Sequence, residues 1–284
     1  MIIFDISSIA YGLVHSFAKT DDITIELLRH GILKRISDIT MDLKISKSCE
    51  IVIACDSKTN WRKECFEHYK ANRKANRDKA ADKINWSQFF DDFSQLMDEL
   101  KDIKNFTVIK VDYAEADDII ATLCKLKQNA TIISTDKDFR QLCVKYDKVR
   151  LYSPITNKYI DGIEYDLYEH IVKGDKDDGI PHVLNPSNAY TTDEKRTTLS
   201  KKKRLILMDF RHNMDNCIID GADMEKVKER LAENKKLIDL DMIPEYVQND
   251  ILEQYNNYKK SMKSIFNYMI KHRLVKLMDS NAFK

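Results

Sequence analysis

Three short apolar runs in the sequence each end on an aspartate, a residue that can hold a metal ion or begin a helix. The runs are Ile2–Asp5, Ile51–Asp56 and Thr131–Asp136. Runs of this length that are rich in isoleucine and valine, with helical patterns between them, are typical of buried parallel strands. The carboxyl ends of such strands open together onto the crevice where ligands bind. Three carboxylates at that edge would repel one another, so the pattern indicates a bound cation.

Further acidic residues follow the later strands and loops of this pattern. They are Glu115, Asp117 and Asp118 in one cluster, then Asp138, then Asp175, Asp177 and Asp178 in a second cluster. No histidine or cysteine accompanies them at ligand spacing. A site built from oxygen ligands alone suits Mg²⁺ or Mn²⁺.

Each of these acidic residues also has an ordinary structural alternative. Taken singly, the aspartate after a strand could cap the helix that follows, and carboxylates near Glu115 would favour the positive end of a helix. On a regular helix Glu115 and Asp118 share one face, whereas Asp117 lies well around from them. Spacing alone therefore leaves open which two of these three residues could reach a metal.

The order of strands and helices predicts two domains. Over residues 1–162, apolar strands alternate with amphipathic helices, and right-handed crossovers make this a three-layer, doubly wound, mostly parallel α/β domain. A stretch at about residues 57–85 is basic and poor in apolar residues, so we expect it to project from this domain as a helix and loop. Residues 163–284 are expected to form a smaller helical domain.

Composition places the chain among globular proteins and says little about function by itself. Hydrophobic residues make up 43% and the net charge is +1, but six basic residues and no acidic one lie between Lys195 and Arg204. Such a stretch could contact a polyanion or be a solvated face. The apolar runs are too short to span a bilayer, no leader peptide precedes the first strand, and six scattered cysteines suit a reducing compartment. We therefore expect a cytoplasmic protein.

Three motifs together resemble the structure-specific 5′ nucleases, the flap endonuclease and 5′→3′ exonuclease family. They are Tyr113-Ala-Glu-Ala-Asp-Asp-Ile-Ile-Ala121, Ser134-Thr-Asp-Lys-Asp-Phe-Arg-Gln-Leu142 and Gly174-Asp-Lys-Asp-Asp-Gly-Ile-Pro181. Trp61-Arg62 and Tyr69-Lys70-Ala-Asn-Arg73 extend the resemblance, which covers nearly the whole chain and is greatest to the phage ribonucleases H within the family. The fold that it implies is a PIN-like core with a basic helical arch and a helical C-terminal domain.

The resemblance also implies roles for individual residues. Asp5, Asp56, Glu115 and Asp117 with Asp136 would form one metal site, and Asp5 and Asp56 would be central to catalysis. Asp138, Asp175 and Asp178 would form or support a second site, with Asp118 nearby. Lys70 and Arg73 would be catalytic residues of the arch that approach the scissile phosphate. Because they are three residues apart in a stretch expected to be helical, they would share one face of the helix.

One departure from the family pattern concerns duplex binding. Gly179 stands where the family has asparagine, and His182-Val-Leu-Asn-Pro186 replaces its glycine-rich turn. We therefore expect Lys201, Lys202, Lys203 and Arg204 to carry duplex contacts, together with Arg62, Lys70 and Arg73 nearer the arch.

The function implied is that of a Mg²⁺-dependent 5′→3′ exonuclease and flap endonuclease with ribonuclease H activity. Two Mg²⁺ ions roughly 3.5–4 Å apart, with Mn²⁺ as a substitute, would act on RNA–DNA hybrids, flaps and duplex DNA to remove primers in phage replication. The expected protein is a monomer, with the phage single-stranded-DNA-binding protein as a partner.

Two rival classes share parts of this pattern. A PIN-type metal-dependent endoribonuclease has the acidic core without the basic arch or second domain. A phospho-acceptor receiver module would use Asp56, but it needs an acidic pair after the first strand, where this chain has only Asp5 followed by Ile6-Ser7-Ser8.

Overall fold

The computed structural model describes residues 1–17, 23–46, 48–71, 73, 84–162, 164–192 and 196–278. Residue contacts divide the chain into two compact units. The first contains Met1–Thr59, Ala81–Ile163 and Glu245–Lys284, and the second contains Asn60–Ala80 and Glu164–Pro244. The predicted domain boundary at residues 162 and 163 stays a prediction, and residues 72 and 74–83 of the expected arch lie outside the described part of the chain.

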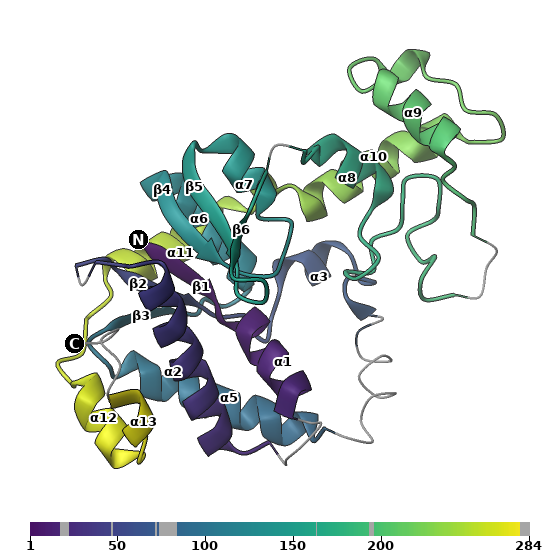
Figure 1. The fold of residues 1–284 in the computed structure, drawn as a ribbon. Coiled ribbons are helices and arrows are strands. Elements are labelled where there is room, and N and C mark those ends of the chain that lie inside the picture. The colour runs from purple at the N-terminus through teal and green to yellow at the C-terminus, as the bar shows by residue number, and fades with distance from the viewer. Residues whose placement is uncertain are drawn as a thin grey trace. The chain divides into compact units, whose positions relative to one another are not determined.

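A six-stranded sheet forms the centre of the first unit, with strand order β3-β2-β1-β4-β5-β6 (Figure 1). The strands are β1 Ile2–Asp5, β2 Ile51–Ala54, β3 Phe106–Ile109, β4 Asn129–Ile133, β5 Lys148–Ser153 and β6 Lys158–Ile160. All neighbouring pairs are parallel except β5 and β6, which are antiparallel. The predicted fold class is confirmed. The sequence analysis missed β6 because its three residues carry no buried apolar pattern.

Helices cover both faces of this sheet, because every residue of β1, β2 and β3 is buried and successive side chains point to opposite faces. On one face lie α1 Ile6–Phe17, α2 Ile25–Asp42 and α5 Trp86–Lys101, which share a core with Phe4 and Ile53. Among the other described helices of the first unit, α6 Ala116–Lys127 packs against β1, β2 and β4, and α7 Arg140–Lys145 packs against β5. The result is a three-layer arrangement that presents the ends of β1, β2 and β4 at one edge.

The C-terminal segment, Glu245–Lys284, is itself part of the first unit. It contains α11 Glu245–Asn256, α12 Ile265–Lys271 and α13 Val275–Met278. Helix α11 contacts α6 and β3, and Arg29 of α2 donates to both Glu99 of α5 and Tyr268 of α12. Although burial alone would raise the pKa of Glu99, hydrogen bonds from Arg29, Tyr268 and Gln95 lower it from 4.5 to about 2.

Replacing Glu99 by glutamine should therefore destabilise the first unit. We expect a loss of about 2 kcal/mol in the free energy of unfolding at neutral pH, after allowing for partial solvent screening. Because the folded pKa is depressed, this contribution is present above pH 4.5 and is lost as the pH falls toward 2. Thermal melting at neutral pH and at about pH 3 measures it. Asp98→Asn on the same helix, which removes an exposed pair with Lys101, is the control. Equal melting temperatures for the two variants would contradict the prediction.

The second unit is helical and has its own apolar clusters. Its helices within the described residues are α3 Trp61–Cys65, α8 Leu167–Lys173, α9 Lys201–Asp209 and α10 Met224–Ile238, with short 3₁₀ turns at Met214–Asn216 and Leu240–Met242. The fully buried Asn234 donates to the carbonyls of Ile171 and Pro181 and so fixes the ends of the acidic loop. Gly174 has a φ of 65°, and a Cβ there would clash with the backbone of Ile180 and Pro181. This loop therefore requires glycine.

Within the described ranges, no helix combines the length and the apolar character needed to cross a membrane.

Candidate active site

Asp5 ends strand β1 and lies at the centre of the acidic edge of the first unit. Its side chain is almost completely buried, at 7% exposure. One carboxylate oxygen accepts a hydrogen bond from the Ser134 hydroxyl at 2.6 Å, and the other accepts from the Ser8 backbone N–H at 3.2 Å. These bonds fix the carboxylate in one orientation at the end of the strand.

Asp56 follows strand β2 and links two helices to the same edge. Its Oδ2 accepts from the Ser7 hydroxyl of α1 at 2.7 Å, and its Oδ1 accepts from the N–H of Ala116, the first residue of α6, at 2.8 Å. Asp56 is exposed, unlike Asp5. Its contact with Ala116 brings the start of the Glu115 motif to the strand ends.

Asp136 and Asp138 occupy the turn after strand β4. Ser134, which donates to Asp5, also accepts from the N–H of Asp136 at 3.0 Å. Asp136 in turn accepts from the N–H of Asp138 at 2.8 Å. Both side chains are half-buried, and Ser134 thus connects the Asp5 carboxylate to the backbone of the turn that carries Asp136 and Asp138.

The electrostatics of this edge suit a bound cation. Burial, followed by the negative charges of Asp56 and Asp136, raises the pKa of Asp5 to about 7, although hydrogen bonds from Ser134 and Ser8 act in the opposite direction. A divalent cation beside these carboxylates would offset both effects. The oxygen donors present are those that Mg²⁺ and Mn²⁺ prefer, so the residues fit such an ion.

Glu115 and Asp118 show the capping alternative that the sequence left open. Helix α6 begins at Ala116 with Glu115 as its N-cap, and the two acidic residues each accept from the other's backbone N–H in a capping box. Asp118 is fully buried in this cap, and its place near the second metal site stays a prediction. Asp117 lies on the first turn and is half-buried.

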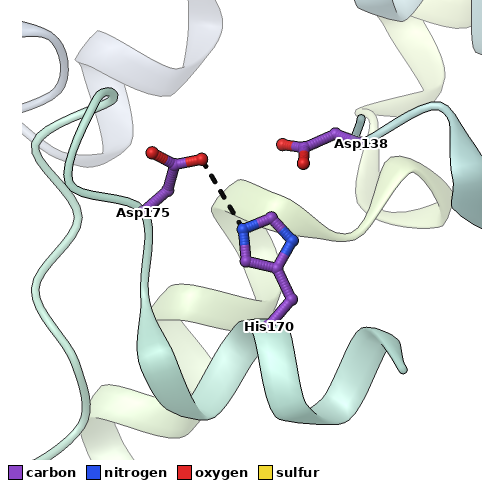
Figure 2. Close-up of side chains that lie close together, drawn as sticks. All are labelled: Asp138, His170 and Asp175. Atoms are coloured by element: carbon purple, nitrogen blue, oxygen red, sulfur yellow. Dashed lines mark ion pairs between the residues drawn. The ribbon is translucent and has the colours of Figure 1, made fainter. Parts of the chain in front are cut away.

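In the second unit, Asp175 has a histidine partner that the sequence analysis missed. His170 Nε2 lies 3.5 Å from Asp175 Oδ2 (Figure 2), and His170 Nδ1 lies 2.9 Å from the Tyr165 hydroxyl. Although burial alone would raise the pKa of Asp175, the bonds from His170 and from the N–H groups of Asp177 and Asp178 lower it. The five-residue spacing of His170 and Asp175 matches no common ligand motif, which is why it gave no signal.

Asp178 is contacted by the residues expected to be catalytic in the arch. Arg73 Nη2 lies 2.6 Å from Asp178 Oδ1, and Lys70 Nζ lies 3.7 Å from Oδ2. The expectation that Lys70 and Arg73 share one helical face is wrong, because Lys70 has a φ of 56° and precedes the helical turn. The two side chains converge because both approach Asp178.

Arg62 is not a surface contact for nucleic acid as predicted. It is 2% exposed, its Nε donates to the Leu237 carbonyl at 3.0 Å, and its guanidinium lies 4.5 Å from the centre of the Trp61 ring. Burial of the Trp61 ring carries the adjacent arginine inward, where it joins α3 to the end of α10.

The four basic residues at the start of α9 differ in exposure. Lys201 and Lys202 are exposed, and Lys203 is half-buried. Arg204 forms an ion pair with Glu169 at 2.9 Å, so part of its charge is already neutralised. The three lysines are therefore the freer charges of this surface, and its predicted contact with duplex DNA stays a prediction.

Changing Lys201, Lys202 and Lys203 together to alanine should weaken duplex binding about equally for every sequence. If all three meet phosphates, the slope of log K against log salt should fall by roughly three. A binding titration across salt concentrations measures this, and Lys125, exposed on α6 of the first unit, provides a control substitution. An unchanged slope in the triple variant would make this surface an ordinary solvated face.

The acidic residues therefore belong to two units. Asp5, Asp56, Glu115, Asp117, Asp118, Asp136 and Asp138 lie in the first unit. Asp175, Asp178, Lys70 and Arg73 lie in the second unit. The second metal site predicted from Asp138, Asp175 and Asp178 draws on both units and stays a prediction.

Comparisons with known proteins agree with this class of site. The description "5'-3' exonuclease, N-terminal resolvase-like domain" matches residues 1–173, and "T4 RNase H, C terminal" matches residues 162–283. The chain is 30% identical to the ribonuclease H of Enterobacteria phage T4 over 290 residues, covering 98% of this chain and 93% of that protein.

Solved structures support the fold. A bacteriophage T5 5′-exonuclease with bound zinc has a TM-score of 0.66 at 21% identity, covering 91% of this chain and 98% of the other. A T5 flap endonuclease complex with DNA and metal ions has a TM-score of 0.62 at 20% identity, covering 90% and 99%.

An α/β core of this topology, with carboxylates at its strand ends and a helical second unit, is that of a phosphodiester-cleaving nuclease. The chain belongs to the 5′→3′ exonuclease family, and the resemblance noted from the sequence motifs is confirmed. It is accordingly a hydrolase.

Proposed function

We propose that this protein is a Mg²⁺-dependent 5′→3′ exonuclease and flap endonuclease with ribonuclease H activity. The observation that carries the proposal is the buried carboxylate of Asp5 beside Asp56 and Asp136, a set of oxygen donors that needs a cation. Identity of 30% to a phage ribonuclease H across nearly the whole chain supports the choice of substrate class.

Asp5, Asp56 and Asp136, with Glu115 and Asp117, would hold one Mg²⁺, and Asp138, Asp175 and Asp178 would hold or support the other. When bound, two such ions activate a water for in-line attack and stabilise the leaving 3′ oxygen. Ser134 and Ser8 orient the Asp5 carboxylate, and Ser7 and the N–H of Ala116 orient that of Asp56. Because these carboxylates are held before the ion arrives, little reorganisation is needed.

The basic residues would handle the nucleic acid. Lys70 and Arg73 would offset charge on the scissile phosphate, and the lysines at the start of α9 would hold the duplex. Products would carry a 5′-phosphate and a 3′-hydroxyl. We propose RNA–DNA hybrids, flaps and duplex DNA as substrates, primer removal in phage replication as the role, and the phage single-stranded-DNA-binding protein as a partner of a monomer in the host cytoplasm.

A panel of labelled substrates tests this proposal. An RNA–DNA hybrid, a DNA 5′-flap, a blunt duplex and a single-stranded RNA are incubated with the protein and Mg²⁺. Cleavage near the 5′ ends of the hybrid and the flap is expected, with the single-stranded RNA cut least. Preference for the single-stranded RNA with internal cuts would instead identify a PIN-type endoribonuclease.

A further inference from the structure

The carboxylate of Asp178 is contacted by three side chains from one short segment of the second unit. Besides the contacts from Arg73 and Lys70, the hydroxyl of Tyr69 donates a hydrogen bond to Asp178 Oδ2 at 2.9 Å. Tyr69 is 2% exposed, and its ring lies 4.9 Å from the Lys70 ammonium. Both carboxylate oxygens are thus engaged by residues of one short segment, two of which the resemblance assigns to substrate.

These contacts involve the side chains, while the backbone is fixed separately. The N–H of Lys70 donates to the carbonyl of Asp178 at 2.8 Å. Lys70 holds this position with a φ of 56°, a left-handed conformation. The Lys70 side chain can therefore leave the carboxylate without a change in the backbone that carries it. Arg73 would also give up the 3.3 Å hydrogen bond from its Nε to the Asp177 carbonyl.

A divalent cation and the Arg73 guanidinium would compete for the same carboxylate. Arg73 Nη2 lies 2.6 Å from Oδ1, so a cation bound to that oxygen would meet a like charge in contact. Lys70, at 3.7 Å from Oδ2, would oppose the cation less. By linkage, whatever weakens one of these interactions strengthens the other by the same factor.

We propose that Asp178 acts as a latch for the arch residues. Without metal it holds Arg73, and more weakly Lys70, away from substrate; occupation of Asp178 by a divalent cation releases both for the scissile phosphate. Conversely, a phosphate that draws Arg73 away raises the affinity of Asp178 for the cation. Metal and substrate would thus assemble the site cooperatively. This inference rests on the proposed function in one respect, that Asp178 is a metal ligand.

The test is calorimetric titration with Ca²⁺, without nucleic acid, on the whole protein. Arg73→Ala should bind Ca²⁺ roughly two- to fivefold more tightly than wild type, because an exposed ion pair of this kind opposes the cation. Lys70→Ala should show a smaller gain, in keeping with its longer distance. Lys63→Ala, which removes an exposed charge from α3 in the same unit, should show almost none. Arg73→Gln keeps a polar side chain without the charge and should behave as Arg73→Ala does.

A further variant, Asp178→Asn, separates failure of the latch from failure of the proposed function. If it binds Ca²⁺ as wild type does, Asp178 is no metal ligand, and both the proposed second site and the latch are wrong. If it loses a Ca²⁺ site while Arg73→Ala and Arg73→Gln keep wild-type affinity, the latch alone is overturned. An equal gain in Lys63→Ala would also overturn it, because the effect would then be general electrostatics. Melting temperatures near wild type confirm that each variant is folded.

Discussion

Replacing Asp56 or Asp136 by asparagine should abolish cleavage while leaving nucleic-acid binding largely intact. Each substitution removes a negative charge from the edge where Asp5 is buried, and with it a ligand for the cation. The expected loss is about 10³-fold or more in the rate of the chemical step, on the order of several kcal/mol. Binding should survive because basic residues elsewhere contact the phosphates.

The structure indicates that the Asp56→Asn variant will fold. The amide oxygen of the introduced asparagine could still accept from the N–H of Ala116, as Asp56 Oδ1 does. Single-turnover cleavage of a 5′-flap duplex at saturating Mg²⁺ measures the rate, and a binding titration in Ca²⁺ measures affinity. Asp147→Asn is the matched control, because Asp147 is exposed just before β5, at the opposite edge of the sheet. Turnover near wild type in either active-site variant would reject the assignment of these carboxylates to the metal.

Replacing Lys70 by alanine should lower the single-turnover rate far more than it weakens substrate binding. If Lys70 offsets charge that develops on the phosphate in the transition state, its removal affects the rate, whereas ground-state phosphate contacts are many. Loss of a preorganised charge of this kind typically costs about 10²- to 10³-fold. The same variant should bind Ca²⁺ slightly more tightly, because Lys70 also approaches Asp178.

Flap cleavage and a Ca²⁺ binding titration on the same substrate separate these effects. Lys63→Ala, an exposed lysine on α3, is the control for loss of charge in the same unit. If Lys70→Ala loses affinity but keeps its rate, the arch holds the substrate and takes no part in the chemistry.

The sequence predicted the first unit well because its signals are local. Runs of buried isoleucine and valine marked β1, β2 and β4, and the carboxyl ends of parallel strands necessarily share an edge. Asp5, Asp56 and Asp136 therefore came together as expected. The sequence analysis did not predict the serine hydroxyls that orient these carboxylates, because the bonded residues are far apart in sequence. Ser134 and Asp5 are separated by 129 positions, and Ser7 and Asp56 by 49.

Other errors came from tertiary contacts that override local patterns. Helical spacing placed Lys70 and Arg73 on one face, but the backbone bond from Lys70 to Asp178 selects a left-handed conformation. The family resemblance assigned Arg62 to nucleic-acid binding, whereas its side chain is buried and donates to the Leu237 carbonyl. No sequence pattern predicted that the last helices would pack within the first unit through Arg29, Glu99 and Tyr268.

The dependence of flap cleavage on divalent metal tests the central claim most directly. The wild-type protein, freed of metal with EDTA, is mixed with a labelled 5′-flap duplex, and the single-turnover rate is measured as Mg²⁺ is restored. We predict no cleavage without metal, recovery as Mg²⁺ is added, and a product bearing a 5′-phosphate on the duplex. Cleavage that persists at full rate in EDTA would contradict the metal-dependent nuclease described here.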